Sequence, residues 1–115
     1  MIENRTRNAQ LARSAEVARG PLERGRGLMG RQGWSASDGL LLEHCNSVHT
    51  FFMRMPIDVL YLDRDGTVLR ADRAVPPWRL GPIVRRARTV LELPAGTIAR
   101  TGTQPGDSVV VDPSA

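Results

Sequence analysis

Lysine is absent from this chain, and all sixteen basic residues are arginine. Cysteine occurs once, as Cys45, so no internal disulfide can form, and aromatic residues make up only 4% of the chain. No apolar run approaches the roughly 20 residues that a membrane-spanning helix needs. Residues 1–5 are also not followed by the apolar segment that is typical of a secretory signal. For a chain of 115 residues, these absences favour a cytoplasmic protein with a single domain over residues 1–115, not associated with a membrane.

The positive charge of the chain is modest and spread out. The formal net charge is +4, and the excess lies in the first 31 residues, which hold seven arginines against three acids. No aromatic side chains alternate with these arginines, as they do on surfaces that stack single-stranded bases. The charge pattern therefore argues against a nucleic-acid partner.

Turn formers and alternating apolar residues predict a chain made mainly of strands. An opening strand is expected within residues 3–17. Gly20-Pro21 then predicts a short helix over residues 21–29, and Gly30 ends it. A second short turn or helix is expected after Pro94. Further strands are expected over residues 39–43, 48–55, 57–62, 67–71, 88–93 and 108–111.

Two segments have distinctive local signals. Asp63-Arg64-Asp65-Gly66 predicts a turn closed by a left-handed glycine, which makes the strands on either side a hairpin. Residues 75–86 hold three prolines and predict a long irregular loop.

Glu92, between two leucines, is expected to face solvent or to pair with an arginine. The predicted core contains Leu28, Met29, Leu41, Phe51, Met53, Val59, Tyr61, Leu91 and Val110.

The predicted fold class is mainly β (β-rich α+β), a compact sandwich or barrel-like sheet with one or two short helices. Four segments carry a family likeness: ARGPLERGRGLMGR, GLLLEHCNSVHTFFMRMPIDVLYLDRDG, ARTVLELPAGT and the closing Gly106-Asp107. In this order they resemble the domain of unknown function 192 family of bacterial and archaeal proteins, over about residues 10–111. The resemblance implies a sandwich-like β fold with short helices and no established activity.

Residues 45–66 combine polar side chains with apolar neighbours and are the candidate site. A corner at Pro56 predicts that Arg54 and Asp58 meet, as a partly buried ion pair or as an arginine oriented to bind an anion. If residues 48–55 form a regular strand, His49 and Arg54 point to opposite faces. The predicted ligand-binding residues are His49, Thr50, Arg54, Asp58 and Trp78.

The function expected from these residues is a non-enzymatic binding module that holds a small anionic ligand or a peptide beside the proline-rich loop. One alternative is a hydrolase-like enzyme that uses His49 with Asp58 or Cys45. Another is a purely structural or interaction protein. His44, Cys45, His49 and Asp58 are all metal-ligand types, but their spacing matches no standard zinc site, so no metal or cofactor is expected.

Overall fold

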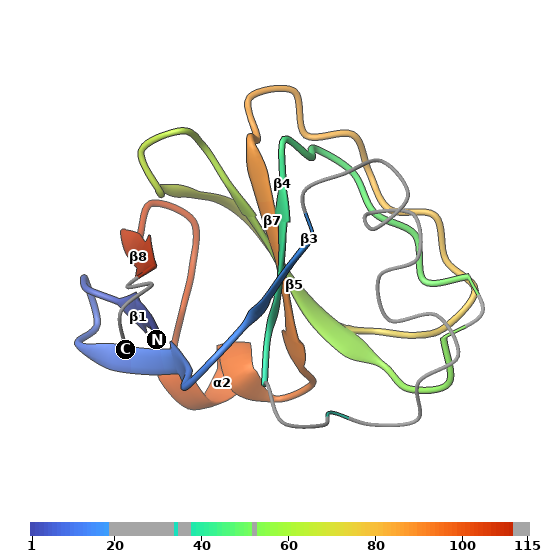
Figure 1. Ribbon diagram of the computed structural model, residues 1–115, viewed down its shortest axis with the longest axis horizontal. Coiled ribbons are helices and arrows are strands. Elements are labelled where there is room, and N and C mark those ends of the chain that lie inside the picture. The colour runs from blue at the N-terminus through green and yellow to red at the C-terminus, as the bar shows by residue number, and fades with distance from the viewer. Residues whose placement is uncertain (19–33, 35–37, 52, 112–115) are drawn as a thin grey trace.

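The computed structural model describes residues 1–18, 34, 38–51 and 53–111 (Figure 1). Within these residues the chain forms eight strands and one short helix, which confirms the predicted fold class. The helix expected over residues 21–29 lies outside the described residues. The elements are β1 (Ile2–Asn4), β2 (Ala9–Ala12), β3 (Glu16–Ala18), β4 (Leu40–Glu43), β5 (Ile57–Leu62), β6 (Val68–Val75), β7 (Thr89–Pro94), α2 (Thr97–Thr101) and β8 (Val109–Val111).

The strands form two sheets. The smaller sheet has the order β2-β1-β8, and the larger has the order β3-β4-β7-β5-β6. β3 and β4 are parallel, whereas the other neighbours in the larger sheet are antiparallel. Figure 1 shows the smaller sheet and α2 on one side of the larger sheet and the long loops on the other. The single opening strand expected within residues 3–17 is in fact three short strands, because the chain turns at residues 5–8 and is irregular at residues 13–15.

The larger sheet is buried on both faces. One face packs against the smaller sheet and α2, where Leu60 of β5 meets Ile2 and Ile98. The opposite face is covered by the loops, and there Val59 and Tyr61 pack with Met53. All six residues of β5 are therefore buried, as its continuous apolar run predicts. Of the predicted core, Leu41, Met53, Val59, Tyr61 and Leu91 are buried, Phe51 and Val110 are half-buried, and Leu28 and Met29 lie outside the described residues.

The predicted hairpin between β5 and β6 is confirmed. The Gly66 N–H donates to the Asp63 carbonyl oxygen at 3.0 Å, and Gly66 has a φ of 84°. A side chain at this position would collide with the main chain of β8, because its Cβ would lie 2.3 Å from the Val109 carbonyl oxygen. The absence of a side chain at Gly66 thus allows both the left-handed conformation of the turn and the close packing of β8 against it.

Residues 48–55 do not form the predicted strand. Among the described residues of this segment, the only sheet-like pairing is an isolated bridge between His49 and Leu80. The Met53 N–H turns back to the Thr50 carbonyl oxygen at 3.2 Å. The segment forms a loop because its backbone groups bond to residues 78–81 and not to a sheet edge.

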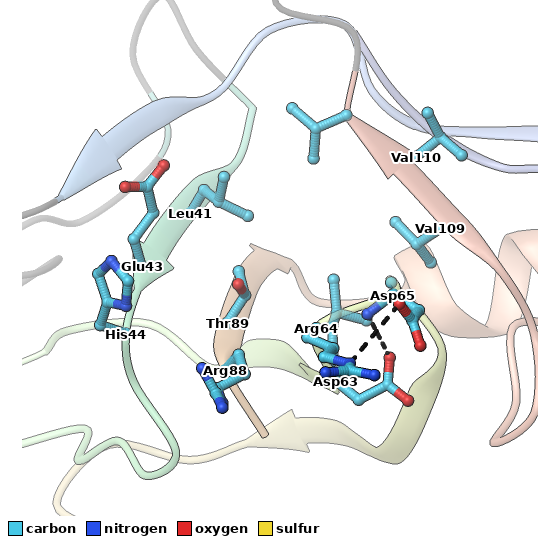
Figure 2. A pocket seen from close by; sticks show the side chains of 13 residues that line it. Leu41, Glu43, His44, Asp63, Arg64, Asp65, Arg88, Thr89, Val109 and Val110 are labelled. Atoms are coloured by element: carbon cyan, nitrogen blue, oxygen red, sulfur yellow. Dashed lines mark hydrogen bonds and ion pairs between the residues drawn. The ribbon is translucent and has the colours of Figure 1, made fainter. Parts of the chain in front are cut away.

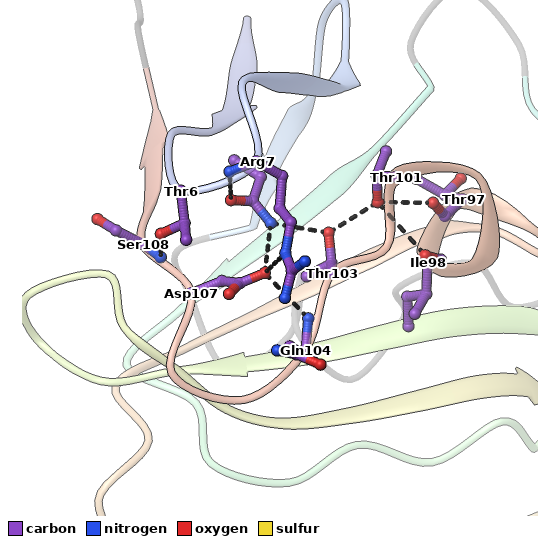
Figure 3. Close-up of polar contacts among 10 residues, drawn as sticks. Thr6, Arg7, Thr97, Ile98, Thr101, Thr103, Gln104, Asp107 and Ser108 are labelled. Atoms are coloured by element: carbon purple, nitrogen blue, oxygen red, sulfur yellow. Dashed lines mark hydrogen bonds and ion pairs between the residues drawn. The ribbon is translucent and has the colours of Figure 1, made fainter.

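A buried polar network joins the two ends of the described chain (Figure 3). The Asn4 side-chain amide donates to Thr103 Oγ1 at 2.9 Å and to Asp107 Oδ2 at 3.0 Å, and Arg7 Nε donates to the same carboxylate oxygen at 2.9 Å. Burial acts to raise the pKa of Asp107, but the hydrogen bonds from Arg7, Asn4 and the Gln104 N–H outweigh it and lower the pKa below its ordinary value. This carboxylate therefore fixes β1 against the segment that precedes β8.

Candidate functional site

Thr50, His49 and Trp78, three of the predicted site residues, lie together where the 46–50 segment meets the proline-rich loop. The Thr50 N–H donates to the Arg79 carbonyl oxygen at 2.8 Å, and the Trp78 N–H donates to the Thr50 carbonyl oxygen at 2.9 Å. The Thr50 hydroxyl donates to the Pro76 carbonyl oxygen at 2.7 Å and accepts the Arg79 N–H at 2.8 Å. Thr50 therefore clamps the loop through both its backbone and its side chain.

The imidazole of His49 is engaged locally. Its Nδ1 accepts the Phe51 N–H at 3.2 Å, and its ring stacks on the Phe51 ring with the centroids 5.1 Å apart. The Phe51 ring in turn lies 6.1 Å from the Trp78 ring. These three rings form a row along the surface of the loop, and Trp78 is 57% exposed.

Asp58 lies elsewhere, on the face of β5 that packs against α2. Its Oδ1 accepts the Ala74 N–H at 2.8 Å, and its Oδ2 accepts the N–H groups of Gly96 at 3.2 Å and Ile98 at 2.8 Å. The side chain is completely buried, so both oxygens are used within the fold. Asp58 thus holds the start of α2 and the end of β6 on β5.

The predicted ion pair between Arg54 and Asp58 is wrong. Arg54 is exposed in a bend of the chain and forms no ion pair with any described residue. Asp58 instead accepts the N–H groups of Ala74, Gly96 and Ile98, so its oxygens are not available to Arg54. The structure therefore brings His49, Thr50 and Trp78 together and separates them from Asp58. Whether any of the five binds a ligand stays a prediction.

The residues proposed for hydrolysis do not contact one another. The Cys45 thiol donates to the Ser47 carbonyl oxygen at 2.9 Å, the His49 imidazole accepts a backbone N–H, and Asp58 accepts three. Within the described part of the chain, no three His, Cys, Asp or Glu side chains gather as a metal site would require.

A pocket of about 280 Å³ lies beneath the proline-rich loop, and we call it the Tyr61 pocket. Its floor is formed by Val59 and Tyr61 of β5, and the loop closes it from above. Thr50 is the single predicted site residue that lines it. The full lining consists of Val48, Thr50, Val59, Tyr61, Asp72, Arg73, Val75, Pro76, Arg79, Leu80, Gly81 and Pro82.

The Tyr61 side chain is the polar feature of this pocket. Tyr61 is 1% exposed, and its hydroxyl lies next to Gly81, where an added Cβ would be only 3.0 Å away. The hydroxyl forms no hydrogen bond with any described residue. Burial raises the pKa of Tyr61 to about 12, and the carboxylate of Asp72 adds to this effect. The hydroxyl therefore remains a hydrogen-bond donor at neutral pH.

A second and larger pocket, of about 660 Å³, opens at the end of the larger sheet (Figure 2). Figure 2 shows Glu43 and His44 on one side and Asp63, Arg64 and Asp65 of the hairpin turn on the other. We call this pocket the sheet-end groove. It is lined by Leu41, Glu43, His44, Leu62, Asp63, Arg64, Asp65, Gly66, Arg88, Thr89, Val109, Val110 and Val111.

The expectation that Glu92 faces solvent or an arginine is wrong. Glu92 is 1% exposed and lies between Leu40 of β4 and Val59 of β5, on the sheet face that the loops cover. Its Oε1 has no hydrogen-bond partner among the described residues. Burial raises its pKa from the ordinary 4.5 to about 8, so the side chain is mostly protonated at neutral pH.

The structure adds pocket residues that the sequence did not single out. Tyr61 was predicted as a core residue, which is correct for its ring but does not reveal where its hydroxyl points. Arg79 lies within the predicted loop and Arg73 shortly before it, and nothing in the local sequence of Arg73 distinguishes it from the other arginines. A tyrosine within a buried strand is the one available signal, because a buried hydroxyl needs a partner.

The two sheets with a pocket beneath a long loop define a small β-rich domain, and comparison assigns it to a family. The chain belongs to the DUF192 family, described as Uncharacterized ACR, whose family model matches residues 2–111. This confirms the resemblance seen in the sequence. No helix among the described residues is long and apolar enough to cross a membrane.

Individual relatives share the fold. Over 63 residues the chain is 36% identical to the UPF0127 protein of Thermococcus sibiricus, a match that covers 55% of this chain and 40% of that relative. The crystal structure of a protein of unknown function from Novosphingobium aromaticivorans is similar with a TM-score of 0.75 and 25% identity, covering 84% of this chain and 74% of that one. A candidate transcription regulator from Sinorhizobium meliloti is similar with a TM-score of 0.71 and 30% identity, covering 84% and 79%.

Proposed function

We propose that the protein is a non-enzymatic binding module for a small organic anion, which binds in the Tyr61 pocket. The observation that carries this proposal is the Tyr61 hydroxyl, a donor on a buried side chain that faces the pocket and has no partner among the described residues. Glu92 Oε1 is the one fully buried side-chain nitrogen or oxygen atom without a partner among the described residues, so the Tyr61 hydroxyl is open to the pocket. A donor in this position can bond to water or to a ligand. An oxygen atom of a ligand would satisfy it.

The charges at the edge of the pocket favour a negatively charged ligand. Arg73 and Arg79 line the pocket, are exposed, and form no ion pair with a described residue. The acid beside them, Asp72, is occupied, because Arg70 Nε donates to its two oxygens at 2.9 and 3.0 Å. A carboxylate held by two guanidinium groups and a phenol matches this set of donors.

The walls of the pocket set the size of the ligand. A volume of about 280 Å³ is close to the lower end of ligand pockets, which run from roughly 300 to 1,000 Å³. Apart from the donors, the lining is mainly valine, proline and leucine. The favoured ligand is therefore a compact carboxylic acid with a short apolar body.

A peptide is the second candidate ligand, because the same loop carries exposed apolar side chains. Trp78, Leu80 and Ile83 are 57%, 76% and 73% exposed. An apolar anchor of a peptide could cover these side chains while a carboxylate entered the pocket.

Hydrolysis is not favoured, since the side chains of Cys45 and His49 bond to backbone groups and not to each other.

The test is a screen of small carboxylic acids by ligand-observed NMR, followed by affinity measurements on variants. Tyr61→Phe removes only the hydroxyl, and Arg79→Gln removes one charge at the rim. Each change is expected to lower the affinity for a ligand of this pocket about tenfold, since a hydrogen bond to a charged group contributes about 1.5–3 kcal/mol. Arg13→Gln, an exposed arginine outside the pocket, is the matched control.

Binding that is equally strong in wild type and Tyr61→Phe would contradict the proposal, as would a screen without hits. If peptides bind but acids do not, and Trp78→Ala abolishes that binding, the peptide alternative is correct.

A further inference from the structure

Four arginines gather around a cleft that lies outside the Tyr61 pocket. The cleft has a volume of about 410 Å³ and is lined by Arg64, Arg85, Arg86 and Arg88 together with Asp63 and Asp65. We call it the arginine cleft. Its arginines come from two separate places in the sequence: the turn between β5 and β6, and the turn that ends the proline-rich loop before β7.

Backbone hydrogen bonds hold these two turns beside each other. The Arg88 N–H donates to the Leu62 carbonyl oxygen at 2.8 Å, and the Arg88 carbonyl oxygen accepts the Cys45 N–H at 3.0 Å. The Ala87 N–H donates to the Val84 carbonyl oxygen at 2.9 Å. The bases of the arginine side chains are therefore fixed by the sheet, although the side chains reach into solvent.

The two aspartates in the cleft offset only part of the charge of the four arginines. Oδ1 of Asp63 accepts the N–H groups of Asp65 at 2.8 Å and of Thr67 at 2.9 Å, so it serves the turn. Asp65 lies 3.9 Å from Arg64, in a pair whose side chains are 75% and 80% exposed, which contributes little. Arg85, Arg86 and Arg88 form no ion pair with any described residue.

The arrangement of charge calls for an anion with several oxygens. Like charges brought together on fixed turns repel one another, and a bound anion would relieve that repulsion. Each guanidinium presents a planar set of donors that can bind two phosphate oxygens at once. We propose that the arginine cleft binds the phosphate group of a small phosphorylated molecule.

The neighbouring space indicates where the rest of that molecule lies. The arginine cleft and the sheet-end groove share Asp63, Arg64, Asp65 and Arg88, so they lie next to each other. Figure 2 shows Asp63, Arg64 and Asp65 on one side of the groove, the exposed His44 on the other, and Arg88 between them. Leucine and valine side chains line the groove between them. A phosphate in the cleft would therefore leave a partly apolar body, such as a nucleoside, in the groove.

The experiment measures binding of three probes by isothermal titration calorimetry at one fixed ionic strength: adenosine 5′-monophosphate, inorganic phosphate and adenosine. The nucleotide is expected to bind most tightly, phosphate more weakly, and adenosine least. Arg86→Gln and Arg88→Gln should each weaken nucleotide binding about tenfold, the typical loss of a charged hydrogen bond. Arg13→Gln, an exposed arginine outside the cleft, should change it less than twofold.

Several outcomes would overturn this inference. Equal losses in Arg86→Gln and Arg13→Gln would mean that the nucleotide responds only to net charge. If the nucleotide binds no more tightly than inorganic phosphate, the sheet-end groove contributes nothing to binding. A single-stranded oligonucleotide that binds more tightly than the nucleotide would indicate a nucleic-acid surface instead. Because Arg86 lies in an exposed turn, Arg86→Gln tests the cleft even if Arg88→Gln fails to fold, and Tyr61→Phe should leave phosphate binding unchanged.

Discussion

Asp58 on β5 accepts the backbone N–H of Ile98 in the first turn of α2 at 2.8 Å, although the two residues are 40 apart in the sequence. The same carboxylate also accepts the N–H groups of Ala74 and Gly96. One side chain thus joins three segments on the buried face of the larger sheet. A carboxylate used in this way contributes to the stability of the fold and is unavailable to a ligand.

Asp58→Ala should lower the free energy of unfolding strongly. The change leaves three backbone N–H groups without their acceptor, of which that of Ile98 is buried and those of Ala74 and Gly96 are partly buried. An unsatisfied buried group costs about 1–3 kcal/mol, so the total loss should be about 2 kcal/mol or more. Urea denaturation measures it, with Asp65→Asn in the exposed hairpin turn as the control. A loss below about 1 kcal/mol would show that water or a neighbouring group replaces the carboxylate.

Glu92→Gln should change how stability depends on pH. Because the pKa of Glu92 is about 8 in the folded protein and 4.5 ordinarily, the folded state keeps a proton that the unfolded chain releases in between. Stability from this group is complete below pH 4.5 and falls as the pH rises to about 8. Each pH unit between these values corresponds to about 1.4 kcal/mol.

The Gln variant has no titrating group at this position and should lose that slope. It should therefore be more stable than wild type at pH 9 by several kcal/mol, with the advantage shrinking toward pH 5. Chemical denaturation at pH 5, 7 and 9 measures both curves. Parallel curves would show that Glu92 is charged when folded.

Thr50→Val should loosen the proline-rich loop. Valine keeps the shape of the side chain but loses the hydroxyl that donates to the Pro76 carbonyl oxygen and accepts the Arg79 N–H. The expected loss in the free energy of unfolding is about 1–3 kcal/mol. Hydrogen exchange should accelerate at residues 76–84 before it does elsewhere. Thr50→Ser, which retains the hydroxyl, is the matched control, and if both variants behave alike the hydroxyl is not the clamp.

Gly66→Ala should be more harmful than Gly102→Ala, although both glycines have a positive φ, of 84° and 71°. The left-handed conformation costs a non-glycine residue about 1–2 kcal/mol at either position. At Gly66 the added Cβ would also lie 2.3 Å from the Val109 carbonyl oxygen, whereas nothing lies within 4 Å at Gly102. The difference between the two losses, measured by thermal denaturation, isolates the close approach of β8. Equal losses would mean that β8 moves away without cost.

Local patterns were sufficient to predict much of the sheet. The hairpin of β5 and β6 is specified by an apolar run, a four-residue turn signal and a glycine, all within a few residues of one another. β4, β7, β8 and α2 also lie close to their predicted positions. Where strands are short, as in the three near the amino terminus, apolar alternation is too brief to separate them.

The candidate site could not be predicted in the same way. Thr50 forms hydrogen bonds with residues nearly 30 positions away, and no local sequence pattern predicts such long-range bonds. Glu92 looks solvent-facing in Leu-Glu-Leu because alternation assumes that one sheet face is exposed, and this sheet is covered on both. The arginine cleft combines residue 64 with residues 85–88, which the pairing of β5 with β7 and the hydrogen bond from Arg88 to Leu62 bring together.

Pairing between β1 and β8 has a consequence for how this protein acquires its structure during synthesis. Asn4 pairs with Val109, so the central strand of the smaller sheet, β1, can pair with β8 only after about a hundred further residues have been synthesised. Contacts between distant parts of a chain slow folding. Until the last strand emerges, Ile2 and Leu11 have only part of their final surroundings, and the nascent chain would offer chaperones an apolar surface that disappears once the two ends meet.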